Sequence, residues 1–186
     1  MRIFVSGGCN NGKSYYAQHL AKTQRTDPLY YVATMRPVDL EDDARIERHR
    51  QERADWGFTT VEQPADIENI LQKCDISGSF LLDSLTALLA NEMFLPDGGC
   101  NKQAAAKIIA GLSNVINTIE NIVIVSDHIY SDAMLYDPLS EKYRKSLAEI
   151  DRAAVQLCDA VIEVAFTNLI IHKGGEAFNA IAQKIG

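Results

Sequence analysis

The sequence predicts an α/β phosphate-loop domain, an NTPase-like fold with a mostly parallel central sheet flanked by helices and an antiparallel C-terminal edge. An apolar strand pattern at residues 3–5 runs into a glycine-rich turn at residues 7–14 and then into a helical pattern at residues 15–22. A second strand pattern at residues 29–33 completes a βαβ unit, which favours a parallel sheet. An uninterrupted apolar run at residues 122–125 is typical of a central parallel strand.

The glycine-rich turn matches the phosphate-loop pattern G-x-x-x-x-G-K-S over residues 7–14. In this motif the glycines let backbone N–H groups turn toward a phosphate, and the helix start adds free donors and partial positive charge. Lys13 is expected to reach terminal phosphate oxygens, and the Ser14 hydroxyl is expected to hold Mg²⁺. The alternative is a glycine-rich turn before an ordinary helix, which leaves the Lys-Ser ending unexplained. We therefore predict that the chain binds a nucleoside triphosphate.

Composition and charge fit one globular domain that spans residues 1–186. The chain is 47% hydrophobic and 23% charged, and a chain of this length buries about 70% of its unfolded surface. Its formal charge of −7 disfavours a general nucleic-acid or anionic-membrane surface, so a local cluster must hold any phosphate ligand. The four cysteines have no zinc spacing, and the apolar runs are too short to span a membrane. With no leader expected before the first strand, these features predict a cytoplasmic protein.

Residues 39–54 form a predicted charged helix, with acids in its first turns and arginines in its later turns. This order complements the helix dipole. Arg45, His49 and Arg53 have i, i+4 spacing and so share one face. Two interpretations remain open. Composition alone favours a solvated face in which Glu41 pairs with Arg45, whereas a cationic row facing phosphates would keep a ring nitrogen of His49 free as a nucleophile.

Strands and helices alternate over the middle of the chain. The expected elements are a strand at 59–62, a helix at 65–73, a buried strand at 79–83, a helix at 85–93, a loop at 95–101 and a helix at 102–118. Asp83 ends the buried strand, where a phosphate-loop protein carries the acid that orients Mg²⁺ or its waters. Asp83 or Ser84 also suits the N-cap of the next helix, and the two roles are compatible.

The C-terminal third begins where the apolar strand ends at Ser126-Asp127-His128, which provides a second strand-end carboxylate. The expected elements after it are an aperiodic segment at 129–140, a helix at 141–157, and strands at 160–166 and 169–172 joined by a turn at Thr167-Asn168. The aperiodic segment is interpreted as a mobile lid, and the last two strands as an antiparallel edge. His128 is a candidate site residue because of its place after the strand, whereas His19 and His172 are expected to be surface or packing residues.

A set of short motifs in the N-terminal half has a characteristic spacing. The motifs are Gly7-Gly8-x-x-x-Gly12-Lys13-Ser14, Tyr31-Val32-Ala33-Thr34, Arg45-Ile46-x-x-His49-Arg50, Arg53, Trp56, Thr60-Val61-Glu62 and Leu81-Leu82-Asp83-Ser84-Leu85-Thr86. This set resembles the bifunctional adenosylcobinamide kinase / adenosylcobinamide-phosphate guanylyltransferase family of cobalamin biosynthesis. Many families share the phosphate loop, whereas the R-I-x-x-H-R helix is far more specific to this one.

The resemblance implies that His49 is the catalytic nucleophile of the guanylyltransfer. His49 would attack the α-phosphorus of GTP, release pyrophosphate and carry GMP until a phosphorylated corrinoid accepts it. The same phosphate loop would serve an earlier kinase step, driven by ATP or GTP with Mg²⁺. The implied partners are the corrinoid substrate, adenosylcobinamide or its phosphate, and further copies of the chain in a homotrimer.

The family's nucleotide contacts carry over by match to seventeen positions, of which Ser14 and Asp83 are also expected at Mg²⁺. They are Gly7, Gly8, Cys9, Asn10, Asn11, Gly12, Lys13, Ser14, Ala33, Thr34, Met35, Arg50, Gln51, Glu52, Arg53, Glu62 and Asp83. The C-terminal third departs from the family, since its N-E-V-G segment reads Ser126-Asp127-His128-Ile129 here and its G-R-x-N signature reads Ala148-Glu149-Ile150-Asp151. Two other functions therefore stay open, a kinase of another small molecule and a nucleotide-binding regulatory homologue without corrinoid chemistry.

Overall fold

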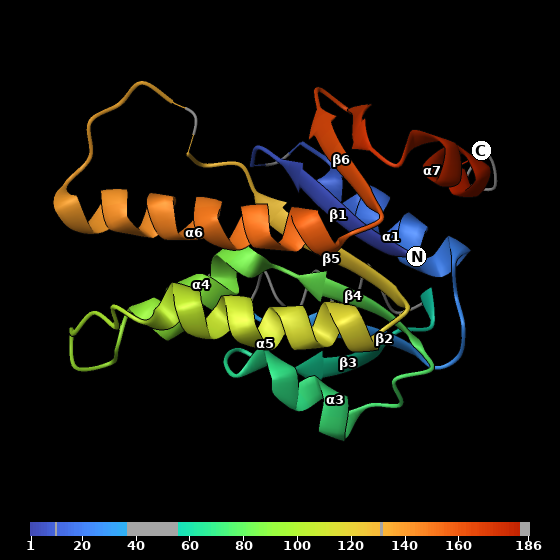
Figure 1. Ribbon diagram of the computed structural model, residues 1–186, viewed down its shortest axis with the longest axis horizontal. Helices are drawn as coiled ribbons and strands as arrows, with labels where there is room; N and C mark the ends of the chain where they lie inside the picture. The colour runs from blue at the N-terminus through green and yellow to red at the C-terminus, as the bar shows by residue number, and fades with distance from the viewer. Residues whose placement is uncertain (10, 37–55, 131, 183–186) are drawn as a thin grey trace.

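A central β-sheet with helices on both faces forms the molecule (Figure 1). The structure is a computed structural model that describes residues 1–9, 11–36, 56–130 and 132–182. The strands are β1 Arg2–Gly7, β2 Leu29–Ala33, β3 Thr59–Glu62, β4 Ser79–Asp83, β5 Asn121–Asp127, β6 Ala160–Ala165 and β7 Asn168–Lys173. The helices are α1 Lys13–Thr23, the 3₁₀ turn η2 Ile67–Asn69, α3 Ile70–Lys73, α4 Leu85–Met93, α5 Ala104–Thr118, α6 Pro138–Leu157 and α7 Gly175–Ala182.

The sheet has the strand order β3-β2-β4-β5-β1-β6-β7 within the described residues. Neighbouring strands run parallel, apart from β6 and β7, which pair antiparallel. The predicted fold class, a mostly parallel sheet with an antiparallel C-terminal edge, is confirmed. Strand β5 lies between β1 and β4, so it separates the strand that leads into the phosphate loop from the strand that ends at Asp83.

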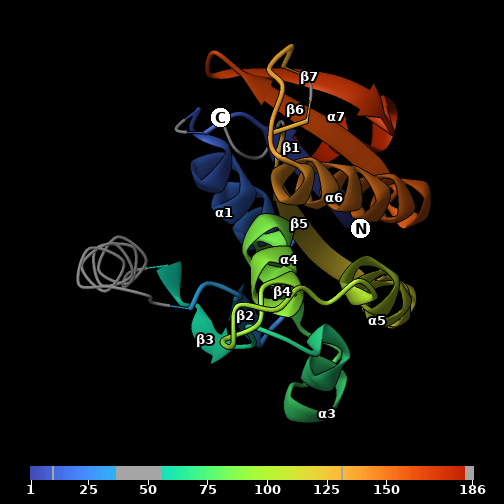
Figure 2. The ribbon, with the colours of Figure 1, turned by 90° about the vertical axis from the view of Figure 1, so that its left-hand side faces the viewer.

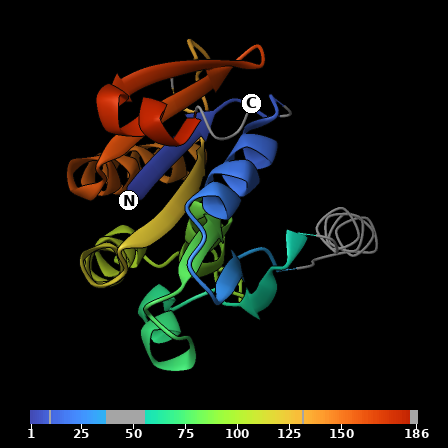
Figure 3. The same cartoon turned by 90° about the vertical axis from the view of Figure 1, so that its right-hand side faces the viewer.

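Apolar side chains on both faces of the central strands explain why these strands read as uninterrupted apolar runs. In β4, for example, Phe80 and Leu82 join the core beneath α4, α5 and α6, whereas Leu81 joins the core beneath α1 and α7. Figures 2 and 3, which view the molecule from opposite sides, show α1 and α5 on opposite sides of β5. The long α6, with its buried Leu147 and Ile150, covers the same face as α5.

Several element boundaries differ from the sequence predictions for local reasons. The helix predicted at 65–73 begins only at Ile67, because Asp66 has a left-handed backbone (φ 51), and it consists of η2 followed by α3. The helix predicted from residue 102 begins at Ala104. The helix predicted from residue 141 begins at Pro138, so the end of the expected lid segment is helical. The Asp137 carboxylate caps it by accepting hydrogen bonds from the N–H groups of residues 139 and 140 (2.9 and 3.1 Å).

The C-terminal hairpin and the last helix add two further differences. The turn between β6 and β7 consists of Phe166 and Thr167, rather than the predicted Thr167-Asn168, and both residues have positive φ (50 and 64). Positive φ at both central positions is the property of a tight two-residue hairpin turn. Helix α7 was not predicted, and its Phe178 is buried in the core that contains α1. None of the helices in the described ranges has the length and apolar character needed to cross a membrane.

Candidate active site

The carboxyl ends of β1, β5 and β4 bring the phosphate loop and two carboxylates to one edge of the sheet. Gly7 at the end of β1 is level with Asp127 at the end of β5, and Asp83 at the end of β4 is level with Val125 of β5. Since β5 is the middle strand of the three, Asp127 lies between the phosphate loop and Asp83. Ligands of open α/β sheets bind at this carboxyl edge.

A cleft of about 340 Å³ lies at this edge, and we call it the strand-end cleft. Four of its lining residues were predicted as nucleotide contacts from the sequence: Lys13, Ser14, Met35 and Asp83. Asp127 and Tyr143 also line it. The structure therefore brings the Lys-Ser end of the phosphate-loop motif and both strand-end carboxylates around a single space.

The phosphate loop has a conformation that depends on two of its glycines. Gly12 has a positive φ of 86, which glycine adopts without strain. Gly7 lies so close to β6 that a Cβ at this position would be 2.6 Å from the carbonyl oxygen of Val164. Asn11 fastens the loop at the same point, since its amide donates to that carbonyl oxygen and its Oδ1 accepts from the N–H of Lys13 (3.1 Å).

Lys13 is held by an ion pair inside the cleft. Its Nζ lies 2.6 Å from Oδ1 of Asp127 and donates to the carbonyl oxygen of Gly8 (3.0 Å). Only 9% of the Lys13 side chain is exposed, against 27% of the Asp127 side chain. The ammonium group is therefore desolvated and already positioned at the mouth of the loop, where Asp127 competes with phosphate oxygens for its charge.

Asp83 is oriented by the neighbouring strand. Its Oδ2 accepts a hydrogen bond from the hydroxyl of Tyr31 on β2 (2.8 Å). Because a hydrogen bond to a carboxylate stabilises its charged form and fixes its direction, this contact prepares Asp83 to face the cleft as an anion.

The oxygen donors of the cleft fit Mg²⁺. The Ser14 hydroxyl and the carboxylates of Asp83 and Asp127 are hard ligands, which Mg²⁺ prefers. No group of three or more His, Cys, Asp or Glu side chains suited to a metal ion occurs in the described part of the chain. This pattern matches an ion that binds through one or two protein oxygens together with phosphates and water, rather than in an all-protein cage.

Other predicted contacts have different surroundings. The buried Thr34 uses its hydroxyl within the protein, since Oγ1 donates to the carbonyl oxygen of Ser84 (2.8 Å) and accepts from its N–H (2.7 Å). Ala33 and Glu62 end β2 and β3, beyond β4 from the phosphate loop. Thr34 thus joins the end of β2 to the start of α4, and its backbone N–H and carbonyl oxygen also have hydrogen-bond partners within the protein.

The remaining predicted positions divide into two groups. Gly8 and Cys9 are exposed in the phosphate loop. Asn10, His49 and residues 50–53 lie outside the described residues, so the roles implied for them by the family resemblance stay predictions.

Sequence reasoning missed several residues of the cleft, including Thr86 and Tyr143. The Thr86 hydroxyl accepts a hydrogen bond from the N–H of Asp127 (3.0 Å), and the Tyr143 hydroxyl donates to the carbonyl oxygen of Thr86 (2.8 Å). Burial and the negative charge of Asp127 raise the pKa of the Tyr143 phenol. Thr86 follows Asp83 closely, so its place just after the end of β4 was a signal that it lies at the same edge of the sheet as the cleft. Tyr143 has no local signal, because it reaches the cleft through the packing of α6 on α4.

The histidines among the described residues, His19, His128 and His172, do not line the strand-end cleft. The His19 ring packs 4.2 Å from the ring of Tyr15 and 4.6 Å from that of Trp56, and burial lowers its pKa. His172 on β7 lies 2.9 Å from a carboxylate oxygen of Glu163. His128 also faces Glu163, at 3.9 Å, and lines a second cavity instead of the strand-end cleft.

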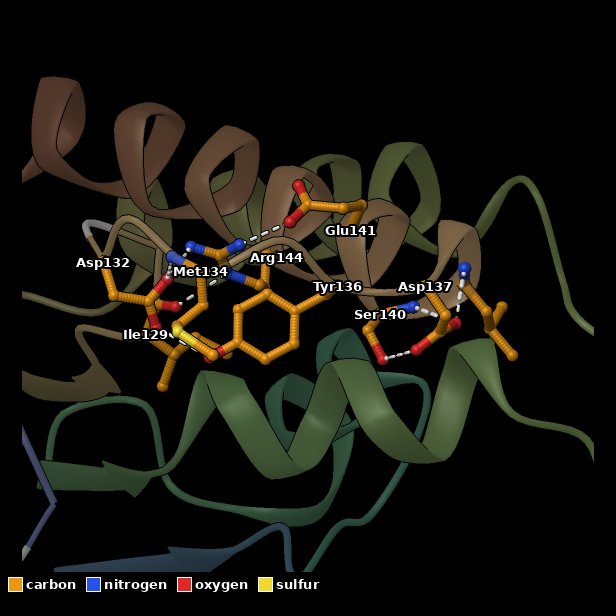
Figure 4. A network of polar contacts seen from close by, with 9 residues as sticks. Ile129, Asp132, Met134, Tyr136, Asp137, Ser140, Glu141 and Arg144 are labelled. Atoms are coloured by element: carbon orange, nitrogen blue, oxygen red, sulfur yellow. Dashed lines mark hydrogen bonds and ion pairs between the residues drawn. The ribbon is translucent and has the colours of Figure 1, made fainter.

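The segment predicted as a lid follows β5, and Arg144 of α6 fastens it (Figure 4). The Arg144 guanidinium donates to the carbonyl oxygen of Ile129 (3.0 Å) and to Asp132 (2.9 Å), and it also binds Glu141 (2.5 Å). The guanidinium carbon lies 4.5 Å from the centre of the Tyr136 ring. The segment therefore has defined attachment points on α6.

A family model and a curated protein match this chain in sequence. The model of the family described as cobinamide kinase / cobinamide phosphate guanyltransferase matches residues 3–167. The bifunctional adenosylcobalamin biosynthesis protein CobU of Escherichia coli K12 is 34% identical over 96 residues, which are 50% of this chain and 51% of that protein. The matched region thus spans about half the length of this curated relative.

Two archaeal structures share a distant overall likeness with the chain. The flagellar accessory protein FlaH of Methanocaldococcus jannaschii is 15% identical, with a TM-score of 0.45 over 92% of this chain and 77% of that one. The protein PH0250 of Pyrococcus horikoshii OT3 is 12% identical, with a TM-score of 0.46 over 92% of this chain and 85% of that one. Neither likeness bears on function at this level of similarity.

Proposed function

Because the chain belongs to the cobinamide kinase / cobinamide phosphate guanyltransferase family, we propose that it phosphorylates adenosylcobinamide and then transfers GMP to the product. The observation that carries this proposal is the strand-end cleft, in which a phosphate loop, a buried lysine and two carboxylates surround one space. This is the set of groups that phosphoryl transfer requires, since its catalysis consists mainly of positioning and charge stabilisation.

In the kinase step, the hydroxyl oxygen of adenosylcobinamide attacks the γ-phosphorus of ATP or GTP. The bond from that phosphorus to the β–γ bridging oxygen breaks, and the nucleoside diphosphate leaves. Lys13 bears part of the charge on the phosphate oxygens, and one of the strand-end carboxylates, Asp83 or Asp127, accepts the hydroxyl proton. Bound Mg²⁺, held by Ser14 and Asp83, would neutralise further phosphate charge.

In the guanylyltransferase step, a ring nitrogen of His49 attacks the α-phosphorus of GTP, and pyrophosphate leaves. An oxygen of adenosylcobinamide phosphate then attacks the same phosphorus, the P–N bond breaks, and GDP-cobinamide is released with His49 restored. A covalent histidine divides one transfer into two in-line displacements. The support for this step is family membership together with the R-I-x-x-H-R motif, in which His49 lies between arginines.

Incubation with GTP labelled at the α-phosphate tests the covalent step. We expect acid-labile, base-stable label on the protein, because a P–N bond to histidine is cleaved by acid. The label should vanish in His49→Ala and persist in His172→Ala, a matched control whose imidazole lies on the exposed edge strand β7. If the wild-type chain takes up no covalent label, the guanylyltransferase proposal falls.

Transfer of the γ-phosphate of ATP or GTP to adenosylcobinamide tests the kinase step separately. If the chain phosphorylates the corrinoid but forms no covalent GMP intermediate, its activity is that of a kinase only. Tight GTP binding without turnover of adenosylcobinamide or its phosphate would instead identify a regulatory homologue. We also propose a homotrimer, from the family resemblance, and a cytoplasmic location, from the sequence features. Sedimentation equilibrium of the purified chain tests the trimer.

A further inference from the structure

A second cavity, of about 270 Å³, lies between α6 and strands β1 and β6, and we call it the Asp151 cavity. Its walls are largely apolar and include Phe4, Val161 and Ala148. Asp151 lines it from α6, and Glu163 lines it from β6. Ligand sites have this composition, an apolar surface with a few polar groups that fix orientation.

Asp151 has an unsatisfied hydrogen-bond acceptor. The residue is only 3% exposed. Its Oδ2 accepts hydrogen bonds from the hydroxyls of Ser126 and Tyr130, both at 3.0 Å. Its Oδ1 is buried and has no hydrogen-bond partner within the described residues. Because a buried acceptor without a partner is costly, this oxygen indicates a donor that lies outside the described residues.

The electrostatic surroundings of Asp151 define the kind of donor. Burial raises the pKa of Asp151 to about 7, which outweighs the hydrogen bonds from Ser126 and Tyr130. Both the ionised and the protonated carboxyl are thus available near neutral pH. A primary carboxamide complements either form, since its N–H donates to a carboxylate and its carbonyl accepts from a carboxylic acid. Arg152 and Glu163, which also line the cavity, carry opposite charges, so they do not together select a charged ligand.

The Asp151 cavity and the strand-end cleft share two structural elements. On α6, Tyr143 lines the cleft and Asp151, eight residues later, lines the cavity. At the end of β5, Asp127 lines the cleft, whereas Ser126 binds Asp151 and His128 lines the cavity. A large substrate that reacts in the cleft therefore has the cavity as a neighbouring subsite.

We propose that the Asp151 cavity receives a carboxamide arm of the corrinoid substrate. The apolar walls take the methylene stem of the arm, and Oδ1 of Asp151 binds the terminal amide. This inference rests on the proposed function, because a corrinoid with peripheral amides is the substrate assigned there. It gives the chain a binding contact for the corrinoid that is separate from its contacts with the nucleotide.

Steady-state kinetics with adenosylcobinamide test the subsite. Replacing Asp151 by leucine should raise KM for adenosylcobinamide about tenfold or more, since a hydrogen bond to a charged group is lost. We expect kcat and GTP affinity to stay within about twofold of wild type, because the amide lies away from the reacting atoms. Ala148→Phe, which fills the cavity but retains the carboxyl, should raise KM likewise. The exposed Gln156→Ala on α6 is the matched control, and it should leave KM unchanged.

A chemical variation of the substrate identifies the arm. The test uses corrinoids in which one carboxamide is hydrolysed to a carboxylate. The positional isomer with the carboxylate on the bound arm should bind the wild-type chain more weakly by about tenfold or more, because its negative charge repels the Asp151 carboxylate. That isomer should lose little further affinity in Asp151→Leu. Equal KM values for wild type, Asp151→Leu and Ala148→Phe would overturn the subsite while leaving the proposed function intact. A wild-type chain that neither binds nor phosphorylates adenosylcobinamide would remove both.

Discussion

Asp151 binds its proton more tightly in the folded chain than in the unfolded chain, because burial raises its pKa from 3.8 to about 7. Between these two values the folded state holds more protons, so stability falls as pH rises. The stability that depends on protonated Asp151 is fully present below the unfolded pKa and is lost as pH rises through the folded pKa. A shift of this size corresponds to about 4 kcal/mol.

Replacing Asp151 by asparagine should remove this pH dependence. The asparagine oxygen can still accept hydrogen bonds from Ser126 and Tyr130, and the side chain has no charge to bury. We expect the free energy of unfolding of Asp151→Asn, relative to wild type, to rise by about 4 kcal/mol between pH 4 and pH 8. Urea unfolding of both proteins across this range measures the difference. A constant offset at all pH values would contradict the burial of an uncompensated carboxyl.

Lys13 is expected to be essential for phosphoryl transfer. Replacing Lys13 by alanine should lower kcat for the kinase step by about 10²- to 10³-fold, as for other charge-stabilising groups. Arginine should not restore activity, because the ammonium group is enclosed between Asp127 (2.6 Å) and the carbonyl oxygen of Gly8 (3.0 Å). Initial rates measure the effect, with the exposed Lys102→Ala as control. Wild-type rates in Lys13→Ala would exclude the phosphate loop from the reaction.

Individual residues show which parts of the site the sequence could predict. Lys13 was found from the phosphate-loop motif, and Asp83 from its place at the end of a strand, because parallel strands end at the same edge. The ion pair between Lys13 and Asp127 was not predicted, because it depends on the insertion of β5 between β1 and β4. The buried oxygen of Asp151 likewise depends on how α6 packs over the sheet, which no local pattern contains.

At the scale of elements, Arg144 connects the segment after β5 to α6. Replacing Arg144 by alanine removes its bonds to Ile129 and Asp132 and its contact with the Tyr136 ring. We expect amide hydrogens of residues 132–137 to exchange about tenfold faster or more, whereas those of the sheet should keep their protection. Hydrogen exchange followed by mass spectrometry measures both, with the exposed Lys145→Ala as control. Unchanged exchange in this segment would mean that Arg144 does not fasten it.

The sequence predicted the bounds of an element correctly where neighbouring residues in the sequence determine them. Strands β2, β3 and β4 and helix α4 have the predicted bounds. The start of α6 was predicted three residues late, because residues 129–140 show no clear period, although Asp137-Pro138 is a helix-start signal. Helix α7 was missed because its eight residues provide little periodicity, and its main anchor is the single buried Phe178.

For the whole molecule, nucleotide binding should be visible as stability. A ligand that binds only the folded chain at 100 times its Kd stabilises it by about 2.7 kcal/mol. We expect GTP with Mg²⁺ to raise the free energy of unfolding of wild type by this amount, and of Asp151→Asn equally. The gain should be much smaller in Lys13→Ala. Denaturant unfolding with and without GTP gives the values, and an equal gain in Lys13→Ala would place the nucleotide elsewhere.

Two hydrogen bonds join the phosphate loop and its helix to the C-terminal hairpin. The Asn11 amide donates to the carbonyl oxygen of Val164 on β6, and the Tyr16 hydroxyl donates to that of Thr167 at the hairpin turn (2.8 Å). The neighbouring Phe166 is 92% exposed. A ligand that displaced this hairpin would therefore act on the phosphate loop and on α1 through these two hydrogen bonds. If such a ligand changes the affinity of the loop for nucleotide, thermodynamic reciprocity requires nucleotide to change the affinity for that ligand by the same factor.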